Sequence, residues 1–148
     1  MLVADGDALC EIRFDGAGIP SGSQRVDSGL LGEAARQLRG YADGVRTAFD
    51  LPLRPRFGGA FERRVWAHVA AIPYGTTTTY GEIAVALNAP GSARAVGAAN
   101  GRNPLPLVVG CHRVIGARGA LTGYAGGLES KRRLLEHEGA LLAMTGLG

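Results

Sequence analysis

The segment TYGEIAVALNAPGSARAVGAAN, Thr79 to Asn100, contains the pattern that decides the fold of the second half of the chain. Thr79 and Glu82 have the spacing of a capping box, which predicts a helix that starts near Tyr80. The stretch NAPGS ends that helix, and Ser92 can cap a second helix over ARAVGAAN. Two short helices joined by a tight turn with proline and glycine are typical of a helix-turn-helix.

The second predicted helix carries small side chains and one long cation, Arg94. Small residues let a helix approach another surface closely, and that surface is either a groove of DNA or the protein's own core. The charge pattern bears on this choice, because the segment from Arg94 to Arg133 holds seven basic residues and one acidic residue, Glu129. Such a local basic field suits a polyanion such as nucleic acid, although a solvated basic face gives the same pattern.

The composition of the whole chain sets broad limits. Its 148 residues, 46% hydrophobic and 20% charged, are enough for one ordinary domain or two small lobes with a buried core. The net charge of +3 identifies no partner by itself. No signal peptide is visible, and no apolar run is long enough for a membrane span. Two distant cysteines, Cys10 and Cys111, fit a reducing cytoplasm and indicate neither a disulfide framework nor a metal site.

Patterns of apolar and turn-forming residues predict an α+β first lobe. Residues 2–14 read as two strands around a turn at Asp5-Gly6-Asp7, and residues 15–24 as a glycine- and serine-rich loop. A helix over residues 30–44 and a third strand over residues 47–53 follow. Prolines and glycines from Pro52 to Gly59 predict a linker, so we expect one lobe over residues 1–57 and a second over residues 58–148.

The second lobe is expected to be mainly helical. A helix over residues 61–72 and a terminal helix over residues 128–142 flank the helix-turn-helix and the segment after it. The run LPLVVG at residues 105–110 reads as a buried strand, and residues 115–123 as a turn or hairpin. The residues expected to face inward are Phe61, Val65, Val69 and Ile72 in the first helix and Leu128, Leu134 and Leu135 in the last.

Cys111 stands at the end of that apolar run and is followed by His112, Arg113 and a glycine-rich segment. A thiol with a pKa near ~8.5 is only slightly ionised at neutral pH, so a reactive cysteine needs a group that takes its proton. A neighbouring imidazole can do this, directly or through one water, and a carboxylate behind it stabilises the imidazolium. Glu136 and Glu138 are both candidates for that carboxylate. The alternative interpretation of Cys111 is a buried structural thiol.

Three segments together resemble one protein family. They are FERRVWAHVAAIPYGTTTTYGEIA, SARAVGAANGRNPLPLVV and CHRVIGARGALTGYAGGLESKRRLLEHEG, and the similarity runs from about Phe61 to Gly139. In this order they resemble the O6-alkylguanine-DNA alkyltransferases, and the first lobe does so only loosely. The resemblance implies an α+β fold, with a small truncated ribonuclease-H-like lobe of sheet and helix before a mainly helical lobe with a helix-turn-helix.

The resemblance also implies a reaction. The protein would flip an O6-alkylguanine, and O4-alkylthymine as a further substrate, out of double-stranded DNA and move the alkyl group irreversibly to its own cysteine. No cofactor and no metal are needed, because DNA is the alkyl donor. We expect a cytoplasmic monomer that acts once, as a stoichiometric reagent.

Catalytic roles follow from the match position by position. Cys111 matches the alkyl acceptor, His112 the residue that activates it through a water, and Glu138, chosen over Glu136, the partner of that histidine. Tyr80 matches the tyrosine that donates to guanine N3, and Asn103 the asparagine that orders the turn near the site. Read without the family, Tyr80 is a packing residue at a helix start and Asn103 an ordinary turn residue.

Binding roles follow in the same way. Arg94 matches the arginine finger that enters the duplex where the nucleotide has rotated out, although by itself it reads as a phosphate contact. Tyr124 matches a tyrosine on the wall of the base pocket. The remaining residues expected to contact DNA are Ser92, Ala95, Tyr80 and Arg102, and those expected to present backbone groups to the base are Val114 and Ala125.

The sequence departs from the family pattern in two places. Gly110 stands where the family has proline, which leaves the chain before Cys111 freer and predicts a slower or less stable protein with the same chemistry. The first lobe is also short compared with the family, which usually carries one more leading strand, so we expect either that an edge strand is missing or that the true start lies upstream. Rival interpretations are a damage sensor that binds alkylated DNA without transfer, a transcription regulator triggered by alkylation, and a helix-turn-helix protein with an inert thiol. Sensors lack the acceptor cysteine, and Cys111 argues against that role.

Overall fold

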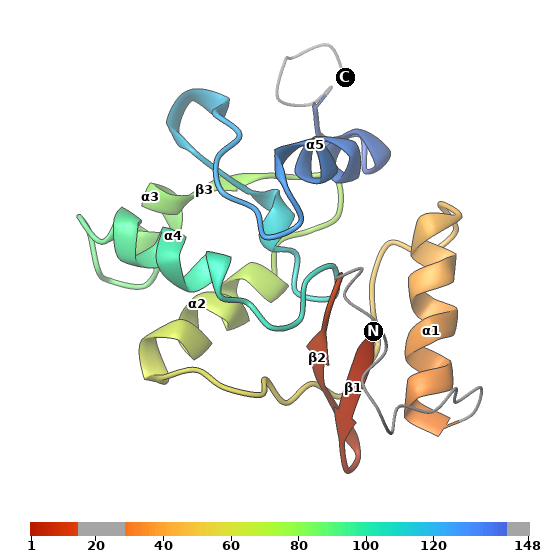
Figure 1. The fold of residues 1–148 in the computed structure, drawn as a ribbon. Coiled ribbons are helices and arrows are strands. Elements are labelled where there is room, and N and C mark those ends of the chain that lie inside the picture. Colours follow the sequence, from red (N-terminus) through yellow and green to blue (C-terminus); the bar gives the residue numbers. More distant parts are fainter. Residues whose placement is uncertain (15–28, 142–148) are drawn as a thin grey trace. The chain divides into compact units, whose positions relative to one another are not determined.

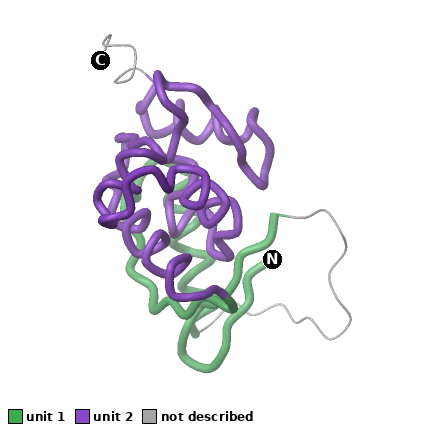
Figure 2. The backbone as a smooth tube through the Cα atoms, turned by 90° about the vertical axis from the view of Figure 1, so that its left-hand side faces the viewer, with its two compact units in different colours: residues 1–57 green, residues 58–148 purple. Residues whose placement is uncertain are grey.

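The computed structural model describes residues 1–14 and 29–141, and the loop expected over residues 15–24 lies outside them. Contacts divide the chain into two compact units, residues 1–57 and 58–148 (Figure 2). The first unit combines a small sheet with one helix, and the second is mainly helical (Figure 1). The α+β class expected from the sequence is therefore confirmed.

The sheet of the first unit is an antiparallel hairpin. Strands β1 (Leu2–Asp5) and β2 (Ala8–Ile12) pair through a turn in which Gly6 has a φ of +61°. Helix α1 (Gly29–Ala42) contributes the buried residues Ala34 and Tyr41 to the core, and the Tyr41 ring lies 5.7 Å from that of Phe49. The hairpin and the helix agree with the sequence patterns.

The strand expected over residues 47–53 is wrong. This segment makes only one isolated bridge, between Leu53 and Leu9, and otherwise has no regular structure. Pro52 has no N–H to donate, so it contributes only its carbonyl to Leu9 at 2.8 Å. The buried side chain of Gln37 holds the segment instead, because its amide exchanges hydrogen bonds of 3.0 and 2.8 Å with the backbone of Asp50.

The second unit is built around helices α2 (Ala60–Ala70), α3 (Tyr80–Ala86), α4 (Ala93–Gly101) and α5 (Leu128–His137). Val65 and Val69 of α2 are fully buried, as expected, and so is Trp66, whose indole N–H donates to the Ala99 carbonyl at 2.7 Å. Gly58 allows this packing, since a Cβ there would lie 2.4 Å from the Trp66 ring and its φ is +118°. Helix α2 is thus fixed against α4.

The helix-turn-helix starts as the sequence predicts. Thr79 Oγ1 accepts from the Glu82 N–H at 3.1 Å, and the Glu82 carboxylate accepts from the Thr79 N–H at 2.7 Å, so the capping box is confirmed. Ser92 stands at the N-cap of α4, but its side chain makes no capping hydrogen bond. Helix α4 packs against both α3 and α2, between which it lies in Figure 1.

Two other expectations for this unit are wrong, and one element was not predicted. The run at residues 105–110 is a tight turn, because Pro104 and Pro106 interrupt any ladder and Leu107 has a φ of +72°. Leu128 begins α5 with half of its surface exposed, whereas Leu135 is fully buried. The sequence also missed a short parallel pair, β3 (Thr78–Thr79) with β4 (Val114–Ile115), which joins the start of α3 to the segment after Cys111.

Candidate active site around Cys111

The turn that presents Cys111 is organised by Asn103. The Asn103 carbonyl oxygen of the side chain accepts from the Leu105 N–H at 3.0 Å, and its amide donates to the Val109 carbonyl at 3.0 Å. The Val109 N–H in turn donates to Leu105 at 2.8 Å, which closes the turn. Asn103 therefore bridges both ends of the segment before the cysteine, at the place where the sequence suggested a strand.

Cys111 opens the 3-10 turn η1 (Cys111–Arg113), in which all three side chains are buried. Burial raises the pKa of the Cys111 thiol, because the thiolate loses hydration, and this effect outweighs a hydrogen bond from the Asn103 side chain and the positive charge of Lys131. The buried amide of Asn100 donates to the Cys111 carbonyl at 3.2 Å. The resting side chain is a neutral thiol, which needs a base to become a nucleophile.

His112 directly follows Cys111 and pairs with Glu138. Its Nε2 lies 2.7 Å from Glu138 Oε1, and both side chains are fully buried. Its Nδ1 is also buried and has no hydrogen-bond partner among the described residues. The pKa of His112 is lowered overall, chiefly by burial and further by the cations of Arg113 and Lys131, against the opposing effect of the Glu138 carboxylate. The imidazole is therefore neutral at rest and has one nitrogen left to accept a proton.

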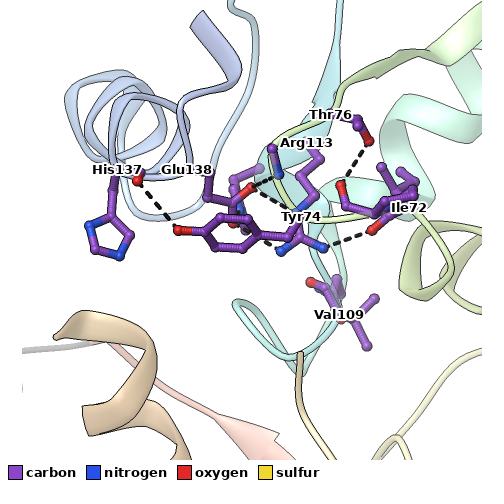
Figure 3. Close-up of polar contacts among 11 residues, drawn as sticks. Ile72, Tyr74, Thr76, Val109, Arg113, His137 and Glu138 are labelled. Carbon is purple, nitrogen blue, oxygen red and sulfur yellow. Dashed lines mark hydrogen bonds and ion pairs between the residues drawn. The ribbon is translucent and has the colours of Figure 1, made fainter. Parts of the chain in front are cut away.

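Glu138 closes α5 and accepts from two further groups besides His112. The Arg113 guanidinium contacts it in a bidentate manner, at 3.0 Å from Nε to Oε2 and 2.9 Å from Nη2 to Oε1, and the Gly75 N–H donates to Oε2 at 3.2 Å. Figure 3 shows the Arg113 side chain reaching from Glu138 to the Ile72 carbonyl. The buried Glu138 carboxylate is thus held by two nitrogens of the Arg113 guanidinium and by one backbone N–H.

Tyr80 lies at the start of α3 with its hydroxyl 3.2 Å from the Thr122 carbonyl, to which it donates. Lys131 of α5 reaches the same carbonyl with its Nζ at 2.8 Å and also donates to the Val114 carbonyl at 2.6 Å. The Lys131 side chain is fully buried, and burial lowers its pKa to about 8. Lys131 therefore ties Val114 to the loop that carries Thr122.

Val114, Tyr124 and Ala125 are the other residues expected to form the base pocket. Val114 is fully buried in β4, while Ala125 is exposed. Tyr124 is half-buried, and burial raises the pKa of its hydroxyl, with a smaller contribution from the charge of Cys111.

The residues expected to contact DNA lie on the helix-turn-helix and its end. Arg94 and Ala95 are exposed on α4, and Ser92 before them is half-buried. Arg102 directly follows α4 and forms an ion pair with Glu62 at 3.3 Å. This face of the second unit presents cations on a helix with small side chains, as a close approach to a polyanion requires.

Sequence reasoning missed four residues of the site: Asn100, Arg113, Lys131 and Gly75. A signal existed for Lys131, which shares a helical face with the buried Leu135 and with Glu138. No such signal existed for Gly75, whose role depends on a contact across 63 positions. Among the described residues, no three His, Cys, Asp or Glu side chains group as metal ligands would, and none of the described helices is long and apolar enough to cross a membrane.

Comparison with known proteins places this chain in a family. Residues 60–140 match the family described as 6-O-methylguanine DNA methyltransferase, DNA binding domain. A methylated-DNA–protein-cysteine methyltransferase of Mycobacterium tuberculosis is 54% identical over 112 residues, which are 76% of this chain and 67% of the relative. A protein with the same name from Methanosarcina acetivorans is 53% identical over 108 residues, 73% of this chain and 69% of the relative.

Solved structures agree with the sequence relatives. The crystal structure of the Mycobacterium tuberculosis O6-methylguanine methyltransferase has a TM-score of 0.83 to this chain at 44% identity, and the match covers 94% of this chain and 85% of that one. The structure of Mycobacterium tuberculosis OGT in complex with DNA has the same TM-score at 47% identity, with the same coverage. The chain therefore belongs to the 6-O-methylguanine DNA methyltransferase family.

Proposed function

We propose that this protein repairs alkylated DNA by transferring the alkyl group from O6 of guanine to the sulfur of Cys111. The proposal rests on the three buried side chains of Cys111, His112 and Glu138. Nε2 of the His112 imidazole lies 2.7 Å from the Glu138 carboxylate, and Nδ1 is left to accept the thiol proton. The relatives named above are methylated-DNA–protein-cysteine methyltransferases, and one of the similar structures contains DNA.

The reaction needs a thiolate in a site where the thiol is neutral at rest. The Cys111 proton moves to Nδ1 of His112, directly or through one water, and Glu138 stabilises the imidazolium. The sulfur then attacks the alkyl carbon, so that the S–C bond forms as the C–O6 bond breaks and the electron pair passes to guanine. Tyr80 donates its hydroxyl proton to N3 of the leaving base. The product is a thioether, so each molecule acts once.

The reaction also needs the damaged nucleotide outside the duplex, because O6 is not accessible to the sulfur within the base stack. The exposed Arg94 of α4 enters the gap and offsets part of the cost of unstacking, while Ser92, Ala95 and Arg102 contact the DNA around it. Tyr124 and the backbone at Val114 and Ala125 receive the flipped base. All of these residues belong to the unit over residues 58–148, which we propose as the alkyltransferase and DNA-binding domain.

We further propose that the protein acts as a cytoplasmic monomer without a cofactor, on O6-alkylguanine and also on O4-alkylthymine in double-stranded DNA. The alkyl donor is the DNA, and every group used in the transfer comes from the chain itself.

The experiment that tests the function is an intact-mass measurement after incubation with a duplex that contains one O6-methylguanine. We expect a gain of one methyl group in the parent protein and none in Cys111→Ala. A protein that binds this duplex selectively and gains no mass is a damage sensor, which contradicts the proposed transfer. A protein that neither binds selectively nor gains mass contradicts the repair function as a whole.

A further inference from the structure

We infer that Arg113 keeps His112 able to accept the cysteine proton, by offsetting the charge of the Glu138 carboxylate. The inference rests on the proposed function for the identity of the reaction. It assigns a role to Arg113, which has none in that proposal. Arg113 acts here through Glu138 and His112 and not on the reacting atoms, so it is a positioning residue.

The Glu138 carboxylate is shared between the two side chains. Oε1 is 2.7 Å from His112 Nε2 and 2.9 Å from Arg113 Nη2, while Oε2 accepts from Arg113 Nε at 3.0 Å and from the Gly75 N–H at 3.2 Å. The exposed fractions of the three side chains are 0% for His112, 7% for Arg113 and 0% for Glu138. Their charges therefore interact in a region that water barely screens.

A buried carboxylate alone beside His112 would stabilise the imidazolium, and an imidazolium cannot take a proton from the thiol. With Arg113 present, carboxylate and guanidinium together carry no net charge when the imidazole is neutral. A proton taken up from solvent would then place two cations against one carboxylate. Burial of His112 and the nearby cation of Lys131 act in the same direction, and burial also keeps the Cys111 thiol and the Tyr124 hydroxyl neutral.

Transfer of the cysteine proton differs from uptake of a solvent proton. When the proton moves from Cys111 to His112, a thiolate forms as the imidazolium forms, so the net charge of the site does not change. Arg113 therefore opposes protonation from solvent more than it opposes the transfer that the reaction needs. This selectivity keeps the base available at neutral pH.

Arg113 is fixed in the position that this role needs. Its Nη1 donates to the Ile72 carbonyl at 2.8 Å, and the guanidinium carbon lies 5.8 Å from the centre of the Tyr74 ring (Figure 3). Gly110 contributes by having no side chain, because a Cβ there would lie 3.0 Å from both Cδ and Nη1 of Arg113. The guanidinium fork can contact both carboxylate oxygens at once, which an ammonium group cannot do with the same geometry.

The decisive measurement is the titration of His112 in the intact protein by NMR of labelled histidine, with His112→Gln to assign the signal. In the parent we expect the midpoint below about 6.5, the value of a free histidine. In Arg113→Met the midpoint should rise by about one pH unit or more, because the carboxylate is no longer offset. Arg113→Lys, which keeps the charge, should stay closer to the parent, and Arg118→Met, at an exposed arginine, should leave the midpoint unchanged.

Two outcomes would overturn the inference: a midpoint above that of free histidine in the parent, or an unchanged midpoint in folded Arg113→Met. A parent midpoint above that of free histidine overturns the inference even if Arg113→Met does not fold. The rate of methyl transfer against pH gives a second reading, in which the acidic limb should move upward in Arg113→Met and far less in Arg113→Lys. The titration does not depend on methyl transfer, so the two proposals can fail separately. If the protein transfers methyl groups but His112 does not titrate as expected, only this inference is contradicted. If His112 titrates as expected but no methyl group is transferred, only the proposed function is contradicted.

Discussion

Lys131 Nζ lies 5.9 Å from the centre of the Tyr80 ring, and both side chains donate to the carbonyl of Thr122. The contact joins α5 to the start of the helix-turn-helix. Both the ammonium group and the phenol are therefore held at the edge of the proposed base pocket by the same backbone oxygen. Because the ammonium group is buried, the charge state of Lys131 is coupled to the stability of this region.

The first prediction concerns pH and Lys131. Its pKa is about 8 in the folded protein against 10.5 for an ordinary lysine, so between these values the unfolded chain holds a proton that the folded chain has lost. Folding stability should therefore rise with pH from about 8 to about 10.5, by about 3 kcal/mol at most. Urea unfolding at several pH values should show this rise in the protein with lysine and not in Lys131→Met.

The titration of Cys111 also affects how the stability depends on pH, and its effect has to be removed from this comparison. The Cys111 thiol has a raised pKa and therefore destabilises the folded state as pH rises above the range where a free thiol ionises, which is the opposite sign. Both proteins should carry Cys111→Ala to remove this effect. If the free energy of unfolding depends on pH equally with and without Lys131, the ammonium group is charged over this whole pH range and is better stabilised than its burial indicates.

The second prediction concerns the reactivity of the thiol. Because burial raises the pKa of Cys111, its alkylation by iodoacetamide in the absence of DNA should be slower at neutral pH than that of a free cysteine and should increase above the ordinary thiol range. Asn103→Ala removes a hydrogen bond that favours the thiolate and should slow the reaction further. Mass spectrometry of the Cys10→Ser protein gives the rate, and Asn88→Gly is the control, at an exposed asparagine whose φ of +57° suits glycine.

The third prediction concerns Gly110. Its φ of −72° suits proline, so reduced freedom of the unfolded chain alone would stabilise Gly110→Pro by about 0.4–1 kcal/mol. The new Cβ would however lie 3.0 Å from Arg113, which is held by Glu138 and Ile72. We expect these effects to cancel or to leave a small net loss in the free energy of unfolding. A gain of the full amount in urea unfolding would show that Arg113 moves aside without cost.

The fourth prediction concerns Arg94. If its side chain fills the gap left by the flipped nucleotide, Arg94→Ala should slow methyl transfer from a duplex by roughly tenfold or more, since unstacking costs a few kcal/mol. Transfer from the free O6-alkylated base should hardly change, because no flipping is needed. The rates with both substrates, measured also for Arg118→Ala, separate this role from a general loss of positive charge. An equal loss with both substrates would contradict insertion into the stack.

The sequence correctly predicted those elements whose start or turn depends on residues only a few positions apart. Thr79 and Glu82 fixed the start of α3 because both partners of the capping box are three positions apart. The Asp5-Gly6-Asp7 turn predicted the β1–β2 hairpin for a similar reason. Tertiary contacts decided the rest, and they are not visible in local periodicity.

Both predicted strands that failed contain proline. The β-branched and apolar residues of 47–53 and 105–110 favour a strand, but Pro52, Pro104 and Pro106 remove the donors that a ladder needs. Both segments are held instead by side-chain amides, from Gln37 in the first unit and Asn103 in the second. The pairing of Thr78 with Val114 could not be predicted, because strands of two residues are too short to show an alternation of apolar and polar side chains.

The candidate site was predictable where residue type and family resemblance agreed, as for Cys111, His112 and Glu138. The sequence alone left Glu136 and Glu138 equivalent, and the structure places the Glu138 carboxylate against His112 while Glu136 pairs with Arg132 on the surface. Arg113 and Lys131 were missed because buried cations are rare, so basic residues were read as part of an exposed field.

The hydrogen bond from Trp66 to the Ala99 carbonyl makes the chain's single tryptophan an optical reporter of the helix-turn-helix. The indole is buried at the junction of α2 and α4, and its N–H ends on the backbone of the helix that carries Arg94. A shift of α4 when DNA engages it would change the polarity around this ring and the wavelength at which it emits. The chain thus carries a built-in fluorescence probe of that helix, and no label has to be attached near the site.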